Sequence, residues 1–166
     1  AIKWASEKGI VNGYGGTNKF GPNDNITREE FVKIALGVMG IEPNPGIVAF
    51  SDVDASSWYA PYVNAALSAG IVSGYSDTQF GVGEYITRQD VAVILNRIHN
   101  FSNANVSTPF SDSNDISDYA KSAVEKLSGA GIINGSESKF MPKSNCTRAE
   151  AACMVYRMMS LMKEGK

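Results

Sequence analysis

One short pattern occurs three times in this chain, and this repetition is the feature that most constrains the fold. In each copy a Thr-Arg pair is preceded by Ile or Cys and followed closely by a carboxylate, at residues 26–30, 86–90 and 146–150. The three threonines, at 27, 87 and 147, are therefore 60 residues apart. A fixed period of this kind indicates a repeat architecture, in which each copy is one supersecondary unit. We expect three copies of one unit in a single domain.

Each copy has the features of a helix start. The threonine suits the N-cap position, where its hydroxyl accepts from a backbone N–H of the first turn. Glu30 and Glu150 lie three residues on and complete a capping box, and Asp90 is a shorter, weaker version. Apolar residues then follow at i, i+3, i+4 and i+7 spacing, which predicts an amphipathic helix after each Thr-Arg pair.

The arginine at the first helical position is not explained by helix formation. Arg28, Arg88 and Arg148 each place a cation where the helix dipole disfavours it by a few tenths of a kcal/mol. Free N–H groups at a helix start attract anions, and a guanidinium adds a bidentate grip on carboxylate or phosphate. Alternatively, each arginine pairs with a neighbouring Asp or Glu. The residues leave both interpretations open.

Two further patterns complete the repeat. A Gly-Ile-x-x-Gly loop occupies residues 9–14, 70–75 and 131–136, and each copy leads to a phenylalanine. A Phe-x-Asp start followed by an aromatic residue and a second helical face occurs at residues 50–67 and 110–127. We place the repeats at about 1–40, 50–100 and 110–163 of one domain, 1–166, with polar linkers at 40–48 and 100–109. The first copy lacks its start, which by register would precede Ala1, so we expect a piece of a longer protein.

Composition excludes several classes of function. Apolar residues make up 43% and charged residues 19% of the chain, as in globular proteins. The net charge of −2 without a basic stripe argues against nucleic acid, and no apolar run approaches a membrane span. We find no nucleophile–base pair and no metal-ligand spacing, so we expect no catalytic residue, metal or cofactor. Cys146 and Cys153, placed on one helix about 10 Å apart, are expected to stay unpaired.

Taken together, these motifs resemble the S-layer homology family. The family pattern is a Phe-x-Asp-Val start, an aromatic pair, a Gly-Ile-x-x-Gly-Tyr loop and an Ile-Thr-Arg-Ala-Glu helix start, and the match covers the whole chain. The resemblance implies an all-α, pseudo-threefold six-helix bundle of three helix-loop-helix repeats. The second helices have the longest apolar faces, so we expect them around the axis. The implied role is non-covalent anchoring of an exported protein to an anionic cell-wall polysaccharide, outside the cell, with a pyruvate ketal on N-acetylmannosamine as the ligand in many members.

The resemblance also implies binding residues, in grooves between neighbouring repeats. The ligand carboxylate would be held by the motif arginines, Arg28, Arg88 and Arg148. Sugar hydroxyls would donate to the aspartates of the repeat starts, Asp52 and Asp112. A ring face would come from the repeat-start aromatics, Trp58 and Tyr119. Close backbone approach would be permitted by the loop glycines, Gly13, Gly74 and Gly135.

Several of these assignments have alternatives. Asp52 and Asp112 could instead cap a helix or a turn, and Trp58 could be a core residue. Tyr119, Ser136 and Cys146 depart from the family pattern, so we expect an altered site in the third repeat. Because the second repeat keeps every element, replacement of Arg88 or Trp58 is predicted to harm binding more than replacement of Arg148, with folding largely spared. The alternative function is a structural module for contacts between surface-layer proteins.

Overall fold

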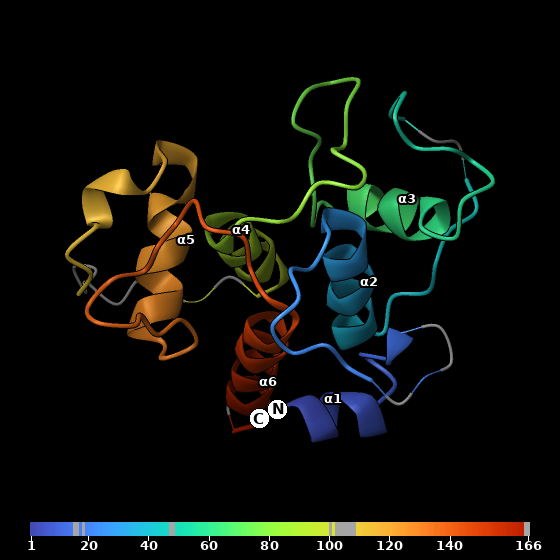
Figure 1. The fold of residues 1–166 in the computed structure, drawn as a ribbon. Helices are drawn as coiled ribbons and strands as arrows, with labels where there is room; N and C mark the ends of the chain where they lie inside the picture. The colour runs from blue at the N-terminus through green and yellow to red at the C-terminus, as the bar shows by residue number, and fades with distance from the viewer. Residues whose placement is uncertain (15–16, 18, 47–48, 100, 102–108, 165–166) are drawn as a thin grey trace.

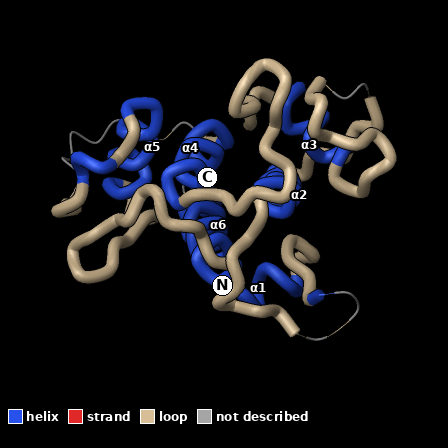
Figure 2. Tube along the Cα trace, turned by 45° about the horizontal axis from the view of Figure 1, so that its top comes forward, coloured by secondary structure: helices blue, strands red, loops and turns tan. Residues whose placement is uncertain are grey.

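The computed structural model describes the chain except residues 15–16, 18, 47–48, 100, 102–108 and 165–166, which include the end of the first predicted linker and most of the second. The described residues form six α-helices (Figure 1): α1 (Ile2–Glu7), α2 (Arg28–Met39), α3 (Ala60–Ser68), α4 (Arg88–Ile98), α5 (Asp118–Gly129) and α6 (Arg148–Glu164). A short 3-10 helix, η2, spans Ser113–Asp115. Strand pairing in the described part is limited to isolated bridges (Figure 2). The all-α prediction is confirmed.

The second helix of each repeat begins where the capping pattern predicts. The Glu30 carboxylate accepts from the N–H of Thr27 at 3.0 Å, and that of Glu150 accepts from the N–H of Thr147 at 2.9 Å. Asp90 is too short to repeat this contact and accepts instead from the Thr87 hydroxyl at 2.7 Å. The one-carbon difference between Asp and Glu therefore changes where this carboxylate points, while all three helices still start at the arginine.

The three helix starts are joined in a closed ring of backbone hydrogen bonds. The N–H of Ile26 donates to the carbonyl of Cys146 (3.0 Å), that of Cys146 to Ile86 (2.9 Å), and that of Ile86 to Ile26 (3.1 Å). All three side chains are fully buried. Helices α2, α4 and α6 leave this ring and contact one another at the centre (Figures 1 and 2). This confirms the pseudo-threefold arrangement with the second helices around the axis.

The first helix of each repeat packs against a different repeat from its own. Helix α3 lies on α2, α5 lies on α4, and α1 lies on α6 (Figure 1). The contact between α1 and α6 joins the first repeat to the third, and in it the side chains of Trp4 and Tyr156 pack edge to face with their centroids 5.2 Å apart. The first helix of each repeat thus lies on the second helix of the preceding repeat. This arrangement brings residues of three repeats to one surface.

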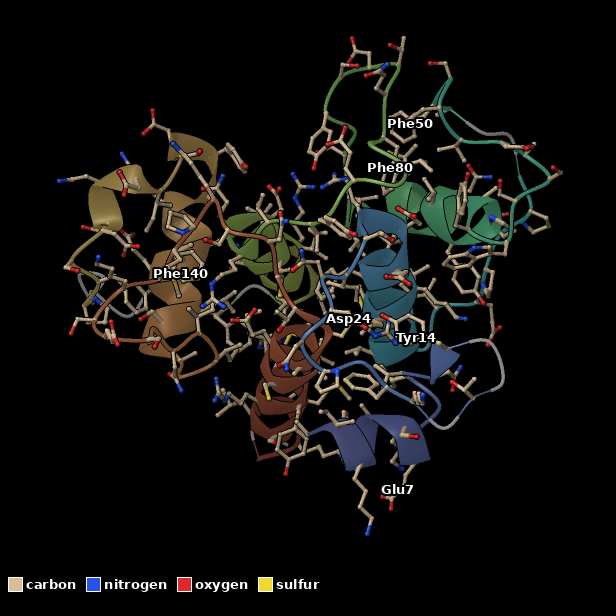
Figure 3. All side chains as sticks on the ribbon, in the orientation of Figure 1. Glu7, Tyr14, Asp24, Phe50, Phe80 and Phe140 are labelled. Atoms are coloured by element: carbon tan, nitrogen blue, oxygen red, sulfur yellow. The ribbon has the colours of Figure 1, made fainter. Side chains whose placement is uncertain are left out.

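The loops between the two helices of a repeat are anchored by phenylalanines. Phe80 and Phe140 are fully buried. Phe50 lies beside Phe80 with ring centroids 5.7 Å apart (Figure 3), and Phe110 lies 5.5 Å from Phe140 in the same way. The Phe of each repeat start therefore packs on the loop of its own repeat, and the loop is held close to the core.

The two cysteines are free, as predicted, although the geometry behind that prediction is corrected. Cys146 precedes α6 rather than lying within it, and only Cys153 is helical. Burial raises the pKa of the Cys146 thiol to about 12, so this side chain behaves as a small apolar group. Within the described residues, no helix is both long enough and apolar enough to cross a membrane.

Candidate functional site

Three surface pockets are related by the pseudo-threefold axis, and we name each by its arginine. Each combines the glycine loop and second helix of one repeat with the arginine of the preceding repeat. The Arg148 pocket has a volume of ≈ 230 Å³, the Arg28 pocket ≈ 300 Å³ and the Arg88 pocket ≈ 310 Å³. Two of these volumes lie at the lower limit of typical small-molecule sites and the third lies below it, so each pocket can hold only a small group.

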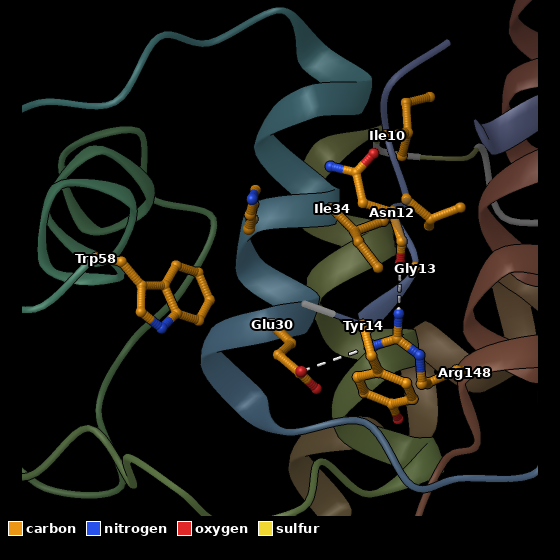
Figure 4. Close-up of a pocket in the computed structure, with 10 residues that line it drawn as sticks. Ile10, Asn12, Gly13, Tyr14, Glu30, Ile34, Trp58 and Arg148 are labelled. Atoms are coloured by element: carbon orange, nitrogen blue, oxygen red, sulfur yellow. Dashed lines mark hydrogen bonds and ion pairs between the residues drawn. The ribbon is translucent and has the colours of Figure 1, made fainter. Parts of the chain in front are cut away.

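The Arg148 pocket runs between the first and second repeats (Figure 4). Arg148 lies at one end against the Asn12–Gly13 loop, and Trp58 lies at the other. Glu30 and Ile34 of α2 line the wall between them. The pocket therefore holds one residue from the third repeat, a wall from the first and an aromatic from the second.

The Arg28 pocket has the same plan one repeat further on. Arg28 faces the loop residues Ser73 and Tyr75, α4 supplies Asp90 and Arg97, and Tyr119 stands in the place that Trp58 has in the Arg148 pocket. The Arg88 pocket has α6 as its wall, including Glu150 and Arg157. No repeat-start aromatic is among the described residues that line the Arg88 pocket.

All three guanidinium groups are buried and held by backbone carbonyls of the next repeat. Arg28 donates from Nε to the Phe80 carbonyl at 2.9 Å and from Nη2 to the Ser73 carbonyl at 2.7 Å. Arg148 makes the equivalent bonds to Phe20 and Asn12, both at 2.9 Å. Arg88 donates to Phe140 at 2.7 Å and more weakly to Asn134 at 3.5 Å. Each arginine thus connects two repeats through backbone carbonyls, and these bonds leave its Nη1 for contacts with side chains or a ligand.

The helix N–H groups that were expected to attract an anion are already in use. The N–H groups of Arg28, Arg88 and Arg148 donate to the carbonyls of Glu84, Ser144 and Asp24, at 2.9, 3.0 and 2.9 Å. At the first position of each helix, the premise of a free N–H group was therefore wrong. An anion in these pockets therefore cannot use the first N–H of the helix, and the outer edge of the guanidinium is the charged group that faces it.

Aromatic rings flank the guanidinium groups, with a difference in the third repeat. Arg28 lies 4.4 Å from the Tyr75 ring centroid and Arg148 lies 4.7 Å from that of Tyr14. Such stacking orients a cation and contributes about 0.5–2 kcal/mol. In the Arg88 pocket Ser136 replaces the tyrosine, and Met141 also lines it. The loop tyrosines therefore pack against the guanidinium groups and also line the pockets. The altered site expected for the third repeat corresponds to the Arg88 pocket, which lacks this tyrosine.

A methionine in the third repeat stands where the second repeat has a glycine. Gly81 lies within the turn that Asp52 binds, and a side chain there would overlap the Tyr75 ring. Its counterpart in the third repeat is Met141, which adopts a positive φ of 55°. Ser136 replaces the tyrosine that would meet a side chain at this position, so a methionine can be accommodated there. The Arg88 pocket is thus lined by a flexible thioether rather than by a phenol ring.

Comparison with known proteins agrees with this threefold plan. The model of the S-layer homology domain matches residues 1–32, 49–92 and 109–152, one segment in each repeat. The chain belongs to the S-layer homology domain family. Family membership places this S-layer homology domain among the modules of cell-surface proteins.

Similar proteins include both enzymes and surface-layer proteins. The domain is 34% identical to an amylopullulanase of Thermoanaerobacterium thermosulfurigenes and to exoglucanase XynX of Acetivibrio thermocellus, over 95% of the chain in each case. It is 29% identical to a surface-layer 125 kDa protein of Lysinibacillus sphaericus, also over 95% of the chain. The match spans only 9%, 15% and 14% of these three proteins. The enzyme names therefore describe proteins that consist mostly of other sequence.

The repeat-start aspartates of this S-layer homology domain hold their own loops. The Asp52 carboxylate accepts from the N–H groups of Phe80, Gly81 and Val82 at 2.7–3.1 Å. Asp112 does the same for Phe140 and Met141 at 2.8 and 2.7 Å. Neither residue lines one of the three pockets. The geometry therefore favours the turn-capping alternative for both, and a contact with sugar stays a prediction.

Replacing the Asp52 charge should reveal this role through the pH dependence of folding. Burial raises the pKa of the Asp52 carboxyl group, but the N–H groups of Phe80, Val82 and Gly81 outweigh it and lower the pKa below 3.8. This contribution to stability is present above the unfolded pKa and is lost as pH falls through the folded one. Asp52→Asn should cost about 1–3 kcal/mol at pH 7, and the cost should shrink on acidification. Urea unfolding between pH 7 and 3 measures this; an equal cost at every pH would contradict it.

The repeat-start aromatics are exposed. Trp58 is 52% and Tyr119 62% exposed, so the core alternative for Trp58 is wrong. Trp58 lies near Lys33, whose ammonium is 5.5 Å from the indole centroid. Because Trp58 shares its pocket with Arg148, and Arg88 shares its pocket with neither aromatic, the geometry no longer supports ranking Arg88 above Arg148.

The loop glycines have a different structural reason from the one expected. A Cβ on Gly74 would overlap the carbonyls of Gln79 and Ser76 and the ring of Phe50. Gly13 and Gly135 are similarly closed in by the backbone of their own loops. All three glycines line their pockets, but the atoms that a side chain would overlap belong to the protein interior of the loop. Ligand approach at these glycines stays a prediction.

Three cations in the pockets were missed by sequence reasoning. Arg97 and Arg157 occupy the same position of α4 and α6 and line the Arg28 and Arg88 pockets, and Lys33 lines the Arg148 pocket. Their spacing could have identified them. Lys33 lies three residues after Glu30, and Arg97 and Arg157 lie seven residues after the motif carboxylates, which places each cation on the same helix face as its carboxylate. Within the described residues, no group of three or more His, Cys, Asp or Glu side chains is placed to hold a metal ion.

Proposed function

We propose that this S-layer homology domain attaches a larger exported protein to the cell wall by binding an anionic, pyruvylated polysaccharide in the arginine pockets. The observation that carries the proposal is a buried guanidinium at one end of an open pocket and an exposed aromatic ring at the other. Arg148 with Trp58 and Arg28 with Tyr119 both have this arrangement. An acidic sugar offers a carboxylate to the first and a ring face to the second.

The guanidinium is suited to a carboxylate because it is already desolvated and oriented. Two of its nitrogens are fixed by loop carbonyls, so its remaining edge needs no further ordering when a ligand binds. A charge-assisted hydrogen bond in such a site is shorter and stronger than a neutral one. The aromatic ring adds apolar contact at the other end of the pocket.

Removal of the pyruvate ketal from the wall polymer should abolish retention of this domain on cell walls. Loss of one charge-assisted bond, worth about 1.5–3 kcal/mol, weakens each site about tenfold to hundredfold. The measurement is co-sedimentation with purified walls before and after mild acid removal of the ketal, with neutral N-acetylmannosamine as a competitor that should have little effect.

Two outcomes would contradict the proposal. Equal retention on native and depyruvylated walls would show that the carboxylate is not recognised. Concentration-dependent self-association without any retention on walls would instead favour a module for contacts between surface-layer proteins.

A further inference from the structure

The three pockets differ in what neutralises their arginine. Nη1 of Arg88 forms a close ion pair with Oε1 of Glu150, and Nη1 of Arg148 lies 3.6 Å from Oε1 of Glu30. In both cases the same carboxylate caps the helix with its other oxygen. A single glutamate therefore serves the helix start of its own repeat and the arginine of the preceding one.

The Arg28 pocket lacks this ion pair. Asp90 holds the equivalent position, and its Oδ2 accepts from the Thr87 hydroxyl at 2.7 Å. Its Oδ1 accepts from the Tyr119 hydroxyl, also at 2.7 Å. Among the described residues, no carboxylate lies within ion-pair distance of Arg28, although this side chain is only 5% exposed.

Tyr119 is itself fixed, so the position of Asp90 is set by more than one contact. The side-chain amide of Gln89 donates to the Tyr119 hydroxyl at 2.9 Å and to the Ser117 hydroxyl at 3.1 Å. The N–H of Ser117 returns a bond to Gln89 Oε1 at 3.1 Å. This network ties the start of the third repeat to α4 and holds the Asp90 carboxylate away from Arg28.

We propose that the three pockets are not equivalent, and that the residue at position 90 makes the Arg28 pocket the primary site for the ligand carboxylate. The inference rests on the proposed function and adds which pocket binds the ligand most tightly and which residues cause the difference. In the Arg28 pocket the ligand supplies the missing counter-ion. In the other two pockets it has to displace Glu30 or Glu150, so those are weaker sites.

A second cation supports this assignment. Arg97 lines the Arg28 pocket and is held loosely, with Nη1 3.4 Å from both the Ile71 carbonyl and the Ser73 hydroxyl. The Arg28 pocket thus has two guanidinium groups and one carboxylate that is already bonded to two hydroxyls. Arg157 occupies the same helix position in the Arg88 pocket, but there Glu150 neutralises Arg88.

The test exchanges the two carboxylates between pockets. The probe is the methyl glycoside of N-acetylmannosamine carrying a 4,6-pyruvate ketal, titrated calorimetrically into the wild-type domain. Asp90→Glu should extend the carboxylate to Arg28, as Glu30 and Glu150 do for their partners, and weaken the tightest site about tenfold, the size of one charge-assisted contact. Glu150→Gln should leave that site unchanged and strengthen a second one. Glu125→Gln, an exposed change on α5, is the charge-matched control and should alter neither.

A second pair of variants tests whether Tyr119 acts by holding Asp90. Tyr119→Phe should weaken the tightest site, because Asp90 is then released towards Arg28. In an Asp90→Asn background the same change should have little effect, since no carboxylate remains to be released. An equal loss in both backgrounds would overturn this positioning role.

The outcomes for the inference and for the proposed function can be told apart. If the wild type binds the probe and Asp90→Glu binds equally well, position 90 does not select the pocket and the inference is wrong. Assignment of the tightest site to Arg148 or Arg88 by the shifts of their Nε–H resonances would also overturn it. If the wild type binds neither this probe nor native wall polymer, the proposed function fails and the inference with it.

Discussion

Arg148→Ala is expected to lower the free energy of unfolding by about 2–4 kcal/mol, a loss between that of hydrogen bonds to a charged group and that of a broken buried ion pair. Arg148 is 8% exposed and bonds the carbonyls of Asn12 and Phe20, 136 and 128 residues away in the chain. Its removal leaves both carbonyls without these donors and Glu30 without its cation. Glu30 remains partly hydrated, with 31% of its side chain exposed, which keeps the loss below the upper limit for buried pairs.

Thermal and urea unfolding of the variant would measure this loss. Lys143→Ala is the matched control, because it removes one exposed positive charge of the same repeat and should change stability by less than about 0.5 kcal/mol. If Arg148→Ala unfolds like this control, the guanidinium does not hold the first and third repeats together. Arg148→Lys should recover only part of the loss, since an ammonium cannot reach both carbonyls in a fork.

This expectation reverses one drawn from the sequence. The helix dipole argument treated the motif arginines as unfavourable for the helix and predicted that their loss would spare folding. That argument considered only the helix to which each arginine belongs. The structure shows that the partners of Arg88, for example, are Phe140, Asn134 and Glu150 of another repeat. A local electrostatic cost of a few tenths of a kcal/mol is outweighed by several long-range hydrogen bonds.

The features of the fold that depend on local chemistry could be predicted. Thr27, Thr87 and Thr147 mark the helix starts because capping is decided within four residues. The apolar spacing after them identified the buried faces of the central helices. The packing of α3 on α2, rather than on α4 of its own repeat, could not be predicted. An apolar face indicates that a helix is buried but does not say against which other helix.

The same limit applies to the candidate site. Sequence reasoning selected Arg28 and Tyr119, which share a pocket, but it could not place them together because they belong to different repeats. Asp52 was selected for sugar, whereas its carboxylate is occupied by three N–H groups that lie 28 to 30 residues further along the chain. The Asp-for-Glu difference at position 90 was noticed only as a weaker cap. Its consequence for Arg28 depends on the contact with Tyr119, which only the folded structure reveals.

Gly74→Ala is expected to destabilise the domain by about 1–3 kcal/mol, and to impair the Arg28 pocket together with the fold. Gly74 does not have a left-handed backbone conformation, so strain at φ is not the cause. The added methyl would instead overlap the carbonyls of Gln79 and Ser76 and the ring of Phe50. Backbone carbonyls cannot turn aside as a flexible side chain can. The loop from Ser73 to Phe80, whose carbonyls bind Arg28, has to shift as a whole.

Gly37→Ala is the matched control, because it should raise the free energy of unfolding where Gly74→Ala lowers it. Gly37 lies within α2, and nothing is within 4 Å of a Cβ built there. Replacement by alanine in a helix interior should therefore stabilise the domain by about 0.5–1 kcal/mol through lower backbone entropy of the unfolded chain. Urea unfolding of both variants at one pH measures the difference between a crowded and an open glycine. Equal effects of the two substitutions, or a stable Gly74→Ala domain that binds the wall normally, would contradict the prediction and show that the loop around Gly74 can shift to accommodate a methyl group.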